Sequence, residues 1–173
     1  MSTVLFSDGS RVLHDRLDIR EMLRLTRRDY ECYGCTALLD AVVGAIRHVD
    51  LVQKVQPQGY EADRVLFVIT TDGQENASRR YTYPQVKGMI EKRWRMGWEF
   101  LFIGANIDAA AEAASLGIAL ERAADYVADG RGTEVLYEAV AFAVAEACAC
   151  PASGEMGDAW RAGLDADVRA RRR

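Results

Sequence analysis

The chain has 173 residues, of which 50% are apolar and 28% are charged, and its formal net charge is −4. This length and composition suit a soluble globular domain with a sizeable core, and the acidic balance gives no electrostatic reason to expect nucleic acid or an anionic membrane as a partner. No apolar run approaches the length of a membrane span, and residues 1–6 are too short and lack the basic flank of a signal peptide, so we expect a cytoplasmic protein.

Residues 3–19 have the pattern of an antiparallel β-hairpin. Two apolar runs, 3–6 and 11–19, flank the sequence Ser7-Asp8-Gly9-Ser10. An Asp-Gly pair between such runs indicates a tight turn, because both central residues of a type I′ turn need positive φ. The next segment, residues 20–34, is polar and predicts a long connection with at most a short helical turn.

An amphipathic helix is expected to start at Thr36 and to end near Val55, before Pro57. Apolar residues step along it by three and four positions, which places them on one face. The residues of that face are Leu38, Val42, Ala45, Val49 and Val52.

The stretch over residues 64–76 organises the rest of the chain. It reads Arg-Val-Leu-Phe-Val-Ile-Thr-Thr-Asp-Gly-Gln-Glu-Asn. The apolar residues predict a strand over 65–71 that is buried on both faces, as in the middle of a parallel sheet. The strand ends at Asp72, and Gly73 turns the chain away. Ligands bind at this carboxyl edge of open α/β sheets, so Asp72 is the first candidate for a functional residue.

Two further strands are expected at 98–104 and 125–128, with helices before, between and after them. Asp108 is placed to N-cap the alanine-rich helix that follows the strand at 98–104. Strands that alternate with helices indicate right-handed crossovers. The predicted fold class is therefore α/β, with a doubly wound, mostly parallel sheet and an N-terminal antiparallel hairpin.

The C-terminal part differs in composition from the rest of the chain. Residues 151–173 are rich in Gly, Ala, Asp and Arg, and we expect them to form a mobile tail beyond a domain at 1–150, with a short helix around Trp160 as an alternative. The arginines at the end of the tail are interpreted as solvated rather than as phosphate ligands.

The four cysteines form two close pairs in the sequence, Cys32 with Cys35 and Cys148 with Cys150. Two such pairs could provide four thiolates for zinc. One short spacing is a weak motif, however, and reduced, partly buried thiols are the favoured interpretation.

Three motifs and the order of the elements carry a resemblance to a known family. The motifs are Gly34-Cys35-Thr36-Ala37-Leu38-Leu39-Asp40-Ala41, Val68-Ile69-Thr70-Thr71-Asp72-Gly73 with Glu75-Asn76, and Trp98-Glu-Phe-Leu-Phe-Ile-Gly-Ala-Asn-Ile-Asp108. With these motifs the chain resembles bacterial von Willebrand factor A (vWA) domain proteins over nearly all of residues 3–145. The resemblance implies a Rossmann-like vWA fold and a non-enzymatic protein-interaction module with a metal-ion-dependent adhesion site.

The resemblance also implies roles for single residues. The family's second-motif threonine would be Thr36 and its third-motif aspartate would be Asp72. We expect a protein partner to bind at the edge that these two residues form with Glu75 and Asn76, with Asp108 nearby.

The chain departs from the family at its first motif, because it has no Asp-x-Ser-x-Ser and no strand that ends in one. It resembles a vWA domain that begins at the second strand, so its metal site is incomplete. Thr36 and Asp72 supply too few oxygens for the octahedral shell of Mg2+, and Mg2+ binding by this chain alone is expected to be weak. The structural alternatives are that Thr36 is an N-cap and that Asp72 accepts backbone amides in its turn.

Two other functions stay open besides the interaction module. One is a Mg2+-dependent phosphohydrolase that uses Asp72, and the other is a truncated vWA fragment without a function of its own. No nucleophile-and-base motif and no glycine-rich phosphate loop supports an enzyme. The absent strand leaves two strand edges open unless the hairpin pairs with residues 65–71, and open edges favour a homo-dimer or a strand-donating subunit.

Overall fold

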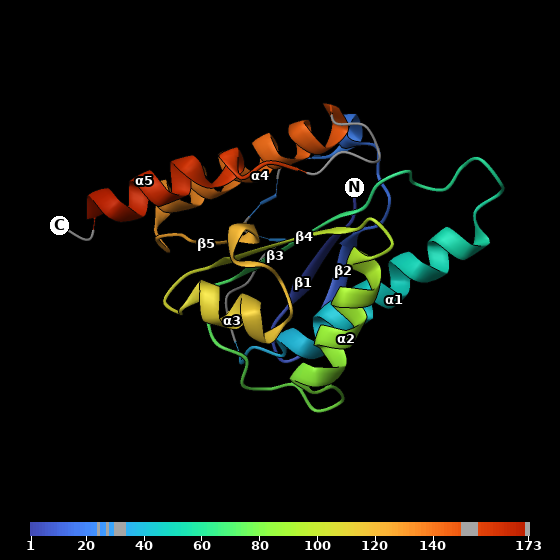
Figure 1. The fold of residues 1–173 in the computed structure, drawn as a ribbon, viewed down its shortest axis with the longest axis horizontal. Coiled ribbons are helices and arrows are strands. Elements are labelled where there is room, and N and C mark those ends of the chain that lie inside the picture. The colour runs from blue at the N-terminus through green and yellow to red at the C-terminus, as the bar shows by residue number, and fades with distance from the viewer. Residues whose placement is uncertain (24, 27, 30–33, 150–155, 172–173) are drawn as a thin grey trace. The chain divides into compact units, whose positions relative to one another are not determined.

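In the computed structural model, residues 1–23, 25, 26, 28, 29, 34–149 and 156–171 are described. They form a mixed α/β protein with a two-stranded antiparallel sheet, a three-stranded parallel sheet and five α-helices (Figure 1). The chain groups into two compact units: unit 1 comprises Met1–Gln56 and Glu75–Thr82, and unit 2 comprises Pro57–Gln74 and Tyr83–Arg173. None of the helices in the described part of the chain is both long and apolar enough to cross a membrane.

Unit 1 begins with the predicted hairpin. β1 (Thr3–Phe6) and β2 (Ser10–His14) pair antiparallel, and the backbone N–H of Ser7 donates to the carbonyl of Gly9 across the turn at 2.8 Å. The hairpin prediction is confirmed, although the second strand ends at His14. The expected type I′ turn is wrong: three residues separate the paired Phe6 and Ser10, and neither Asp8 nor Gly9 has a positive φ. The connection that follows contains one 3-10 turn, η1 (Ile19–Glu21), as expected.

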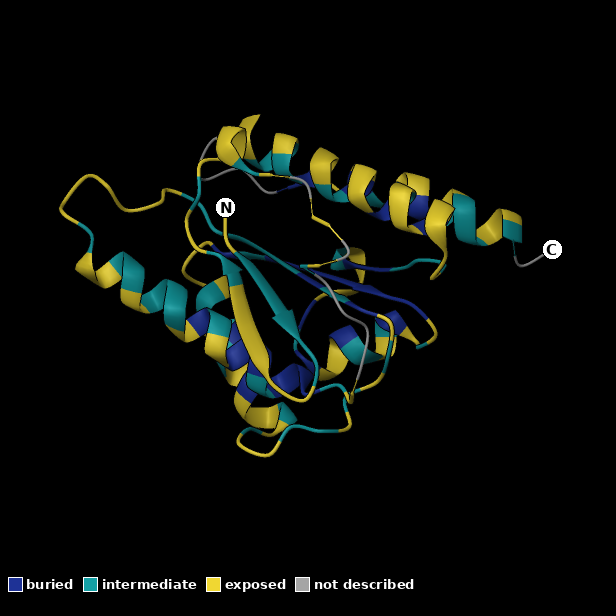
Figure 2. Ribbon diagram, turned by 180° about the vertical axis from the view of Figure 1, so that it is seen from behind, coloured by how far each residue is buried: buried dark blue, intermediate teal, exposed yellow. Residues whose placement is uncertain are grey.

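The core of unit 1 comes from the first half of α1 (Leu38–Val55). Residues on most sides of its first turns are buried: Leu38, Leu39, Ala41, Val42, Val43 and Ile46. Farther along, Leu51 and Val55 are 60% and 68% exposed, and Figure 2 shows the same change from buried to exposed along the helix. The helix starts at Leu38 with Ala37 as its N-cap, so the alternative in which Thr36 is the N-cap is wrong.

The parallel sheet of unit 2 has the order β3-β4-β5, formed by β3 (Leu66–Thr71), β4 (Glu99–Gly104) and β5 (Ala123–Asp125). The expected parallel strands are therefore present, although the third lies at Ala123–Asp125 rather than at residues 125–128. The middle strand, however, is β4, and the prediction of β3 as a middle strand buried on both faces is wrong for the described strands. Most of β3 is only half-buried, whereas β4 is buried from Phe100 to Gly104. Both strands are apolar runs, so hydrophobicity alone could not show which of them is the more buried middle strand.

Helices cover both faces of this sheet (Figure 1). α4 (Gly130–Ala149) and α5 (Ala162–Arg171) lie on one face, and α2 (Tyr83–Trp94) and α3 (Ala109–Ser115) lie on the other. Period-two alternation assigns the side chains of each strand to the two faces. One face supplies Leu101, Ile103 and Ala124 to a buried cluster with α4 and α5.

The C-terminal segment differs from the expected mobile tail. After residues 150–155, which lie outside the described residues, the chain forms η3 (Ala159–Arg161) and α5. Met156, Trp160 and Leu164 recur every four residues and are 3%, 2% and 1% exposed in the core cluster. A short apolar stripe inside a polar, alanine-rich segment is enough to dock it, and average composition conceals such a stripe.

Candidate functional site

The residues that the sequence predicts for the site belong to both units. Thr36, Glu75 and Asn76 are part of unit 1, whereas Asp72 and Asp108 are part of unit 2. Within the described residues, no group of three or more His, Cys, Asp or Glu side chains could hold a metal ion. The pairing of Thr36 with Asp72 as Mg2+ ligands therefore stays a prediction, and we describe each group within its own unit.

Thr36 and Asn76 hold each other by backbone and side-chain hydrogen bonds. The N–H of Thr36 donates to Oδ1 of Asn76 at 2.7 Å, and the N–H of Asn76 donates to the carbonyl of Thr36 at 3.0 Å. The same carbonyl accepts the N–H of Ala77 at 3.3 Å. This reciprocal pair joins the loop after Glu75 to the residues that precede α1.

The carboxylate of Glu75 replaces the N-cap oxygen that α1 lacks. Its Oε2 accepts the N–H of Leu39 at 2.9 Å, which is one of the N-terminal amides without a partner inside the helix. The hydroxyl of Ser78 donates to the same oxygen at 2.7 Å and accepts the N–H of Asp40 at 3.1 Å. Oε1 accepts the N–H groups of Ala77 and Ser78 at 2.9 and 2.7 Å.

This environment sets the ionisation of Glu75. Burial raises the pKa of the Glu75 carboxyl, but the hydrogen bonds from Leu39, Ser78 and Ala77 outweigh it and hold the pKa below its ordinary value. These donors favour the charged form. The negative charge also lies at the N-terminal end of α1, where the helix dipole stabilises an anion.

Asp40 completes the connection from the helix side, and the sequence did not single it out. Its carboxylate accepts the N–H groups of Arg79, Arg80 and Tyr81 at 3.0, 3.1 and 3.1 Å. Glu75 of the loop thus binds the helix, while Asp40 of the helix binds the loop. The contacts span about forty residues of sequence, and the acidic residue in the first turn of α1 was the only local signal.

A groove of about 1070 Å³ lies in unit 1 beside these contacts. The hairpin tip at 8–10, the N-cap Ala37, the side of α1 from Asp40 to Arg47, and the loop at 76–81 line it. Arg47 donates from Nη1 to the hydroxyl of Tyr81 at 2.5 Å, and its guanidinium lies 5.0 Å from the centre of the Tyr81 ring. Small residues of α1, Ala41 and Gly44, leave the groove open along the helix.

Asp72 lies at the carboxyl end of β3, as expected, and its side chain is exposed. The turn after the strand is closed by Thr71, whose hydroxyl donates to the carbonyl of Gly73 at 2.9 Å and accepts the N–H of Gly73 at 3.3 Å. Within the described residues, no backbone amide donates to the Asp72 carboxylate, so the structure does not support the alternative that gave it this role.

Asp108 caps α3, which confirms its predicted N-cap position. Its Oδ1 accepts the N–H of Ala111 at 2.9 Å. Asp125, at the end of β5, accepts the N–H of Ala109 at 3.3 Å. Both carboxylates thus satisfy amides at the start of the same helix, while the expected contact of Asp108 with a partner stays a prediction.

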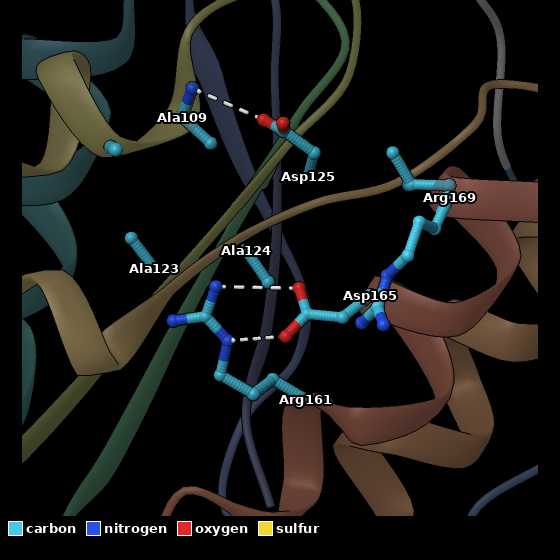
Figure 3. Close-up of a pocket in the computed structure, with 9 residues that line it drawn as sticks. Ala109, Ala123, Ala124, Asp125, Arg161, Asp165 and Arg169 are labelled. Carbon is cyan, nitrogen blue, oxygen red and sulfur yellow. Dashed lines mark hydrogen bonds and ion pairs between the residues drawn. The ribbon is translucent and has the colours of Figure 1, made fainter. Parts of the chain in front are cut away.

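A small pocket of about 280 Å³ lies between the end of β5, the start of α3 and α5 (Figure 3). Its floor is made of alanines, and Figure 3 shows Arg161 and Asp165 facing each other as an ion pair at 3.0 and 3.3 Å. Arg161 also donates to the carbonyl of Leu120 at 3.0 Å. The donors of Arg161 thus serve the protein, whereas Arg169, which Figure 3 labels on α5, also lines the pocket.

The zinc hypothesis falls partly outside the described residues, because it needs Cys32 and Cys150. Cys35 and Cys148 are described, and both are free thiols. They are exposed rather than partly buried, so that part of the expectation is wrong.

Comparisons of the chain with family models, curated proteins and solved structures find no match.

Proposed function

We propose that the chain is a non-enzymatic protein-interaction module of the vWA type, with a doubly wound, Rossmann-like sheet that a protein partner completes. The observation that carries the proposal is the open edge of β3. Among the described strands, β3 pairs with β4 alone, and β1 and β2 pair only with each other. The partner is a strand-donating subunit or a second copy of the chain.

The backbone groups at this edge follow from the register of the sheet. The carbonyls of Val65 and Thr71 accept N–H groups at the two ends of β4, each at 2.9 Å. In a parallel pair, alternate residues face the neighbouring strand. The N–H and carbonyl groups of Leu66, Val68 and Thr70 therefore point away from β4, toward the open edge.

The edge also lacks the features that usually protect a free strand. Natural proteins place charges, prolines or bulges at exposed edges to prevent unwanted pairing. The sequence of β3 is Leu-Phe-Val-Ile-Thr-Thr, which contains none of these residues, and its register with β4 is continuous from Leu66 to Thr71. Such an edge suits β-augmentation, in which backbone hydrogen bonds to an added strand provide affinity.

Blocking the edge is expected to weaken association. We expect the chain at micromolar concentration either to self-associate or to bind a synthetic apolar strand that ends in Asp-Gly-Ser-Gly-Ser, as measured by sedimentation. Thr70→Pro removes an outward N–H without touching the ladder to β4, and should weaken association about tenfold or more, since each net hydrogen bond contributes about 1 kcal/mol and the ring obstructs the neighbouring strand.

Thr70→Val is the matched control, because it keeps the N–H and the branched side chain, and it should associate as the wild type does. A sharp monomer that melts cooperatively and does not bind the strand peptide would contradict the proposal. Equal association of the Pro and Val variants would also contradict it.

Mg2+ affinity should be weak until the missing oxygens are supplied. We expect the chain alone to bind Mg2+ no tighter than about 1 mM, or about −4 kcal/mol, because Thr36 and Asp72 leave most of the water shell in place. Isothermal titration calorimetry with the same strand peptide present should show markedly tighter binding. Asp72→Ala should abolish that gain, whereas Asp63→Ala, at another exposed aspartate, should not. Micromolar Mg2+ affinity for the chain alone would contradict this prediction.

A further inference from the structure

The groove in unit 1 has a charge pattern that the proposed function does not use. Its lining carries the guanidinium groups of Arg47, Arg79 and Arg80 against the carboxylates of Asp8 and Asp40. All three arginines are exposed. The whole chain, by contrast, has a net charge of −4.

The hydrogen bonds of the two aspartates go to backbone amides rather than to these guanidinium groups. Asp8 accepts the N–H of Cys35 at 2.6 Å, and Asp40 accepts the three amides at the end of the loop. No carboxylate of the described residues forms an ion pair with Arg79 or Arg80, and the hydrogen bond of Arg47 goes to the neutral hydroxyl of Tyr81. The groove is therefore lined by three arginines and two aspartates, and within the described part of the chain none of the three guanidinium groups is held in an ion pair.

We propose that this groove binds an acidic peptide segment of a partner protein in an extended conformation. The inference gives the chemistry of a partner for the interaction module, on a surface other than the edge of β3. It rests on the proposed function only in taking that partner to be a protein.

The shape of the groove favours a peptide over a small anion. Its volume of about 1070 Å³ lies just above the range for small-molecule pockets, about 300–1,000 Å³. The amides of Arg79 to Tyr81 could have formed an anion-binding nest, but Asp40 already occupies them. The cations come from two elements, α1 and the loop, which suits carboxylates spaced along a chain.

The composition of the groove favours a peptide over single-stranded nucleic acid. Surfaces for single strands combine a basic track with aromatic rings on which bases stack. Among the described residues the lining has one aromatic ring, Tyr81, and the guanidinium of Arg47 lies 5.0 Å from its centre. Guanidinium groups instead bind carboxylates through parallel hydrogen bonds.

Fluorescence anisotropy with the full-length chain tests the proposal. The probe is a labelled octapeptide of alternating Glu and Gly, compared with the same peptide carrying Gln in place of Glu and with an eight-residue uridine oligonucleotide. We expect the Glu peptide to bind, the Gln peptide to bind at least about tenfold more weakly, and the affinity for the Glu peptide to fall as salt is raised.

Variants then locate the binding. Arg79→Gln combined with Arg80→Gln should weaken binding of the Glu peptide about fivefold or more, because the double variant loses two partly exposed ion pairs with the peptide. The matched control combines Arg95→Gln with Arg131→Gln, which changes the net charge equally at two exposed arginines of unit 2. Circular dichroism melts verify that each variant stays folded.

Three outcomes would overturn the proposal: equal binding of the Glu and Gln peptides, equal loss in the two double variants, or binding of the oligonucleotide without the peptide. A fourth outcome would also overturn the proposal. If the chain self-associates, the groove variants abolish this self-association and the Glu peptide does not bind, then the groove binds a second copy of the chain. Thr70→Pro should leave peptide binding unchanged, so failure at the edge of β3 and failure at the groove are distinguishable.

Discussion

Trp160→Ala should lower the free energy of unfolding by about 3–5 kcal/mol, which is the usual cost of emptying a buried tryptophan site. Trp160 is 2% exposed and packs in the core cluster with Leu101 and Ile103 of β4 and Leu136 of α4. Without the indole ring, the segment of η3 and α5 loses a large buried side chain from this cluster. The total stability of a domain is about 5–15 kcal/mol, so a loss of this size removes a large part of it.

Trp94 provides the matched control for this substitution. It lies at the end of α2 and is 63% exposed, so Trp94→Ala should change stability by only about 0.5 kcal/mol. Chemical denaturation followed by circular dichroism measures both variants. Equal losses, or a cost below about 1 kcal/mol for Trp160→Ala, would contradict the docking of residues 156–171 on the sheet.

The local elements of the fold could be predicted because their signals are local. Asp8-Gly9 indicated the hairpin, the apolar steps along Leu38 to Val52 indicated α1, and Asp108 indicated the start of α3. In each case consecutive residues of the pattern lie within about one turn of each other. Hydrogen bonding and periodicity over such short distances leave a clear pattern in sequence.

The sequence could not predict that β3 lies at an edge of the sheet or that the C-terminal segment docks on it. Whether a strand lies in the middle or at the edge depends on which other strands pair with it, and β3 and β4 have similar apolar sequences. The docking of α5 depends on three apolar side chains, Met156, Trp160 and Leu164, in a segment whose average composition is polar. Pairing and docking are tertiary properties that local propensity does not specify.

The candidate site shows the same division between local and distant contacts. The sequence identified Glu75 and Asn76 by their position after the strand, and both engage the start of α1. It did not identify Asp40 and Ser78, whose hydrogen bonds cross 38 to 41 residues of sequence. Both carboxylate oxygens of Glu75 accept hydrogen bonds from within the protein. A partner that binds beside Glu75 would therefore contact mainly the neighbouring side chains.

Glu75→Gln should lower the free energy of unfolding by about 2–3 kcal/mol, because hydrogen bonds to a charged acceptor are the strongest of their kind. The amide keeps the size of the side chain, but its NH₂ group cannot accept from Leu39 or from the hydroxyl of Ser78. The N-terminus of α1 then loses a cap that Ala37 cannot replace. Urea unfolding at about pH 7 measures the loss.

The same variant should respond differently to acid. The pKa of Glu75 is lower in the folded protein than its ordinary value, so its contribution is fully present above the ordinary glutamate range and is lost as the pH falls through the lowered pKa. The difference in stability between wild type and Glu75→Gln should therefore shrink between about pH 7 and pH 3. Other carboxylates with lowered pKa values, such as Asp15 and Asp129, act on both proteins and cancel in that difference. Glu138→Gln, at an exposed glutamate of α4, should match the wild type at both pH values. A difference that does not change with pH would show that the charge on Glu75 does not stabilise the start of α1.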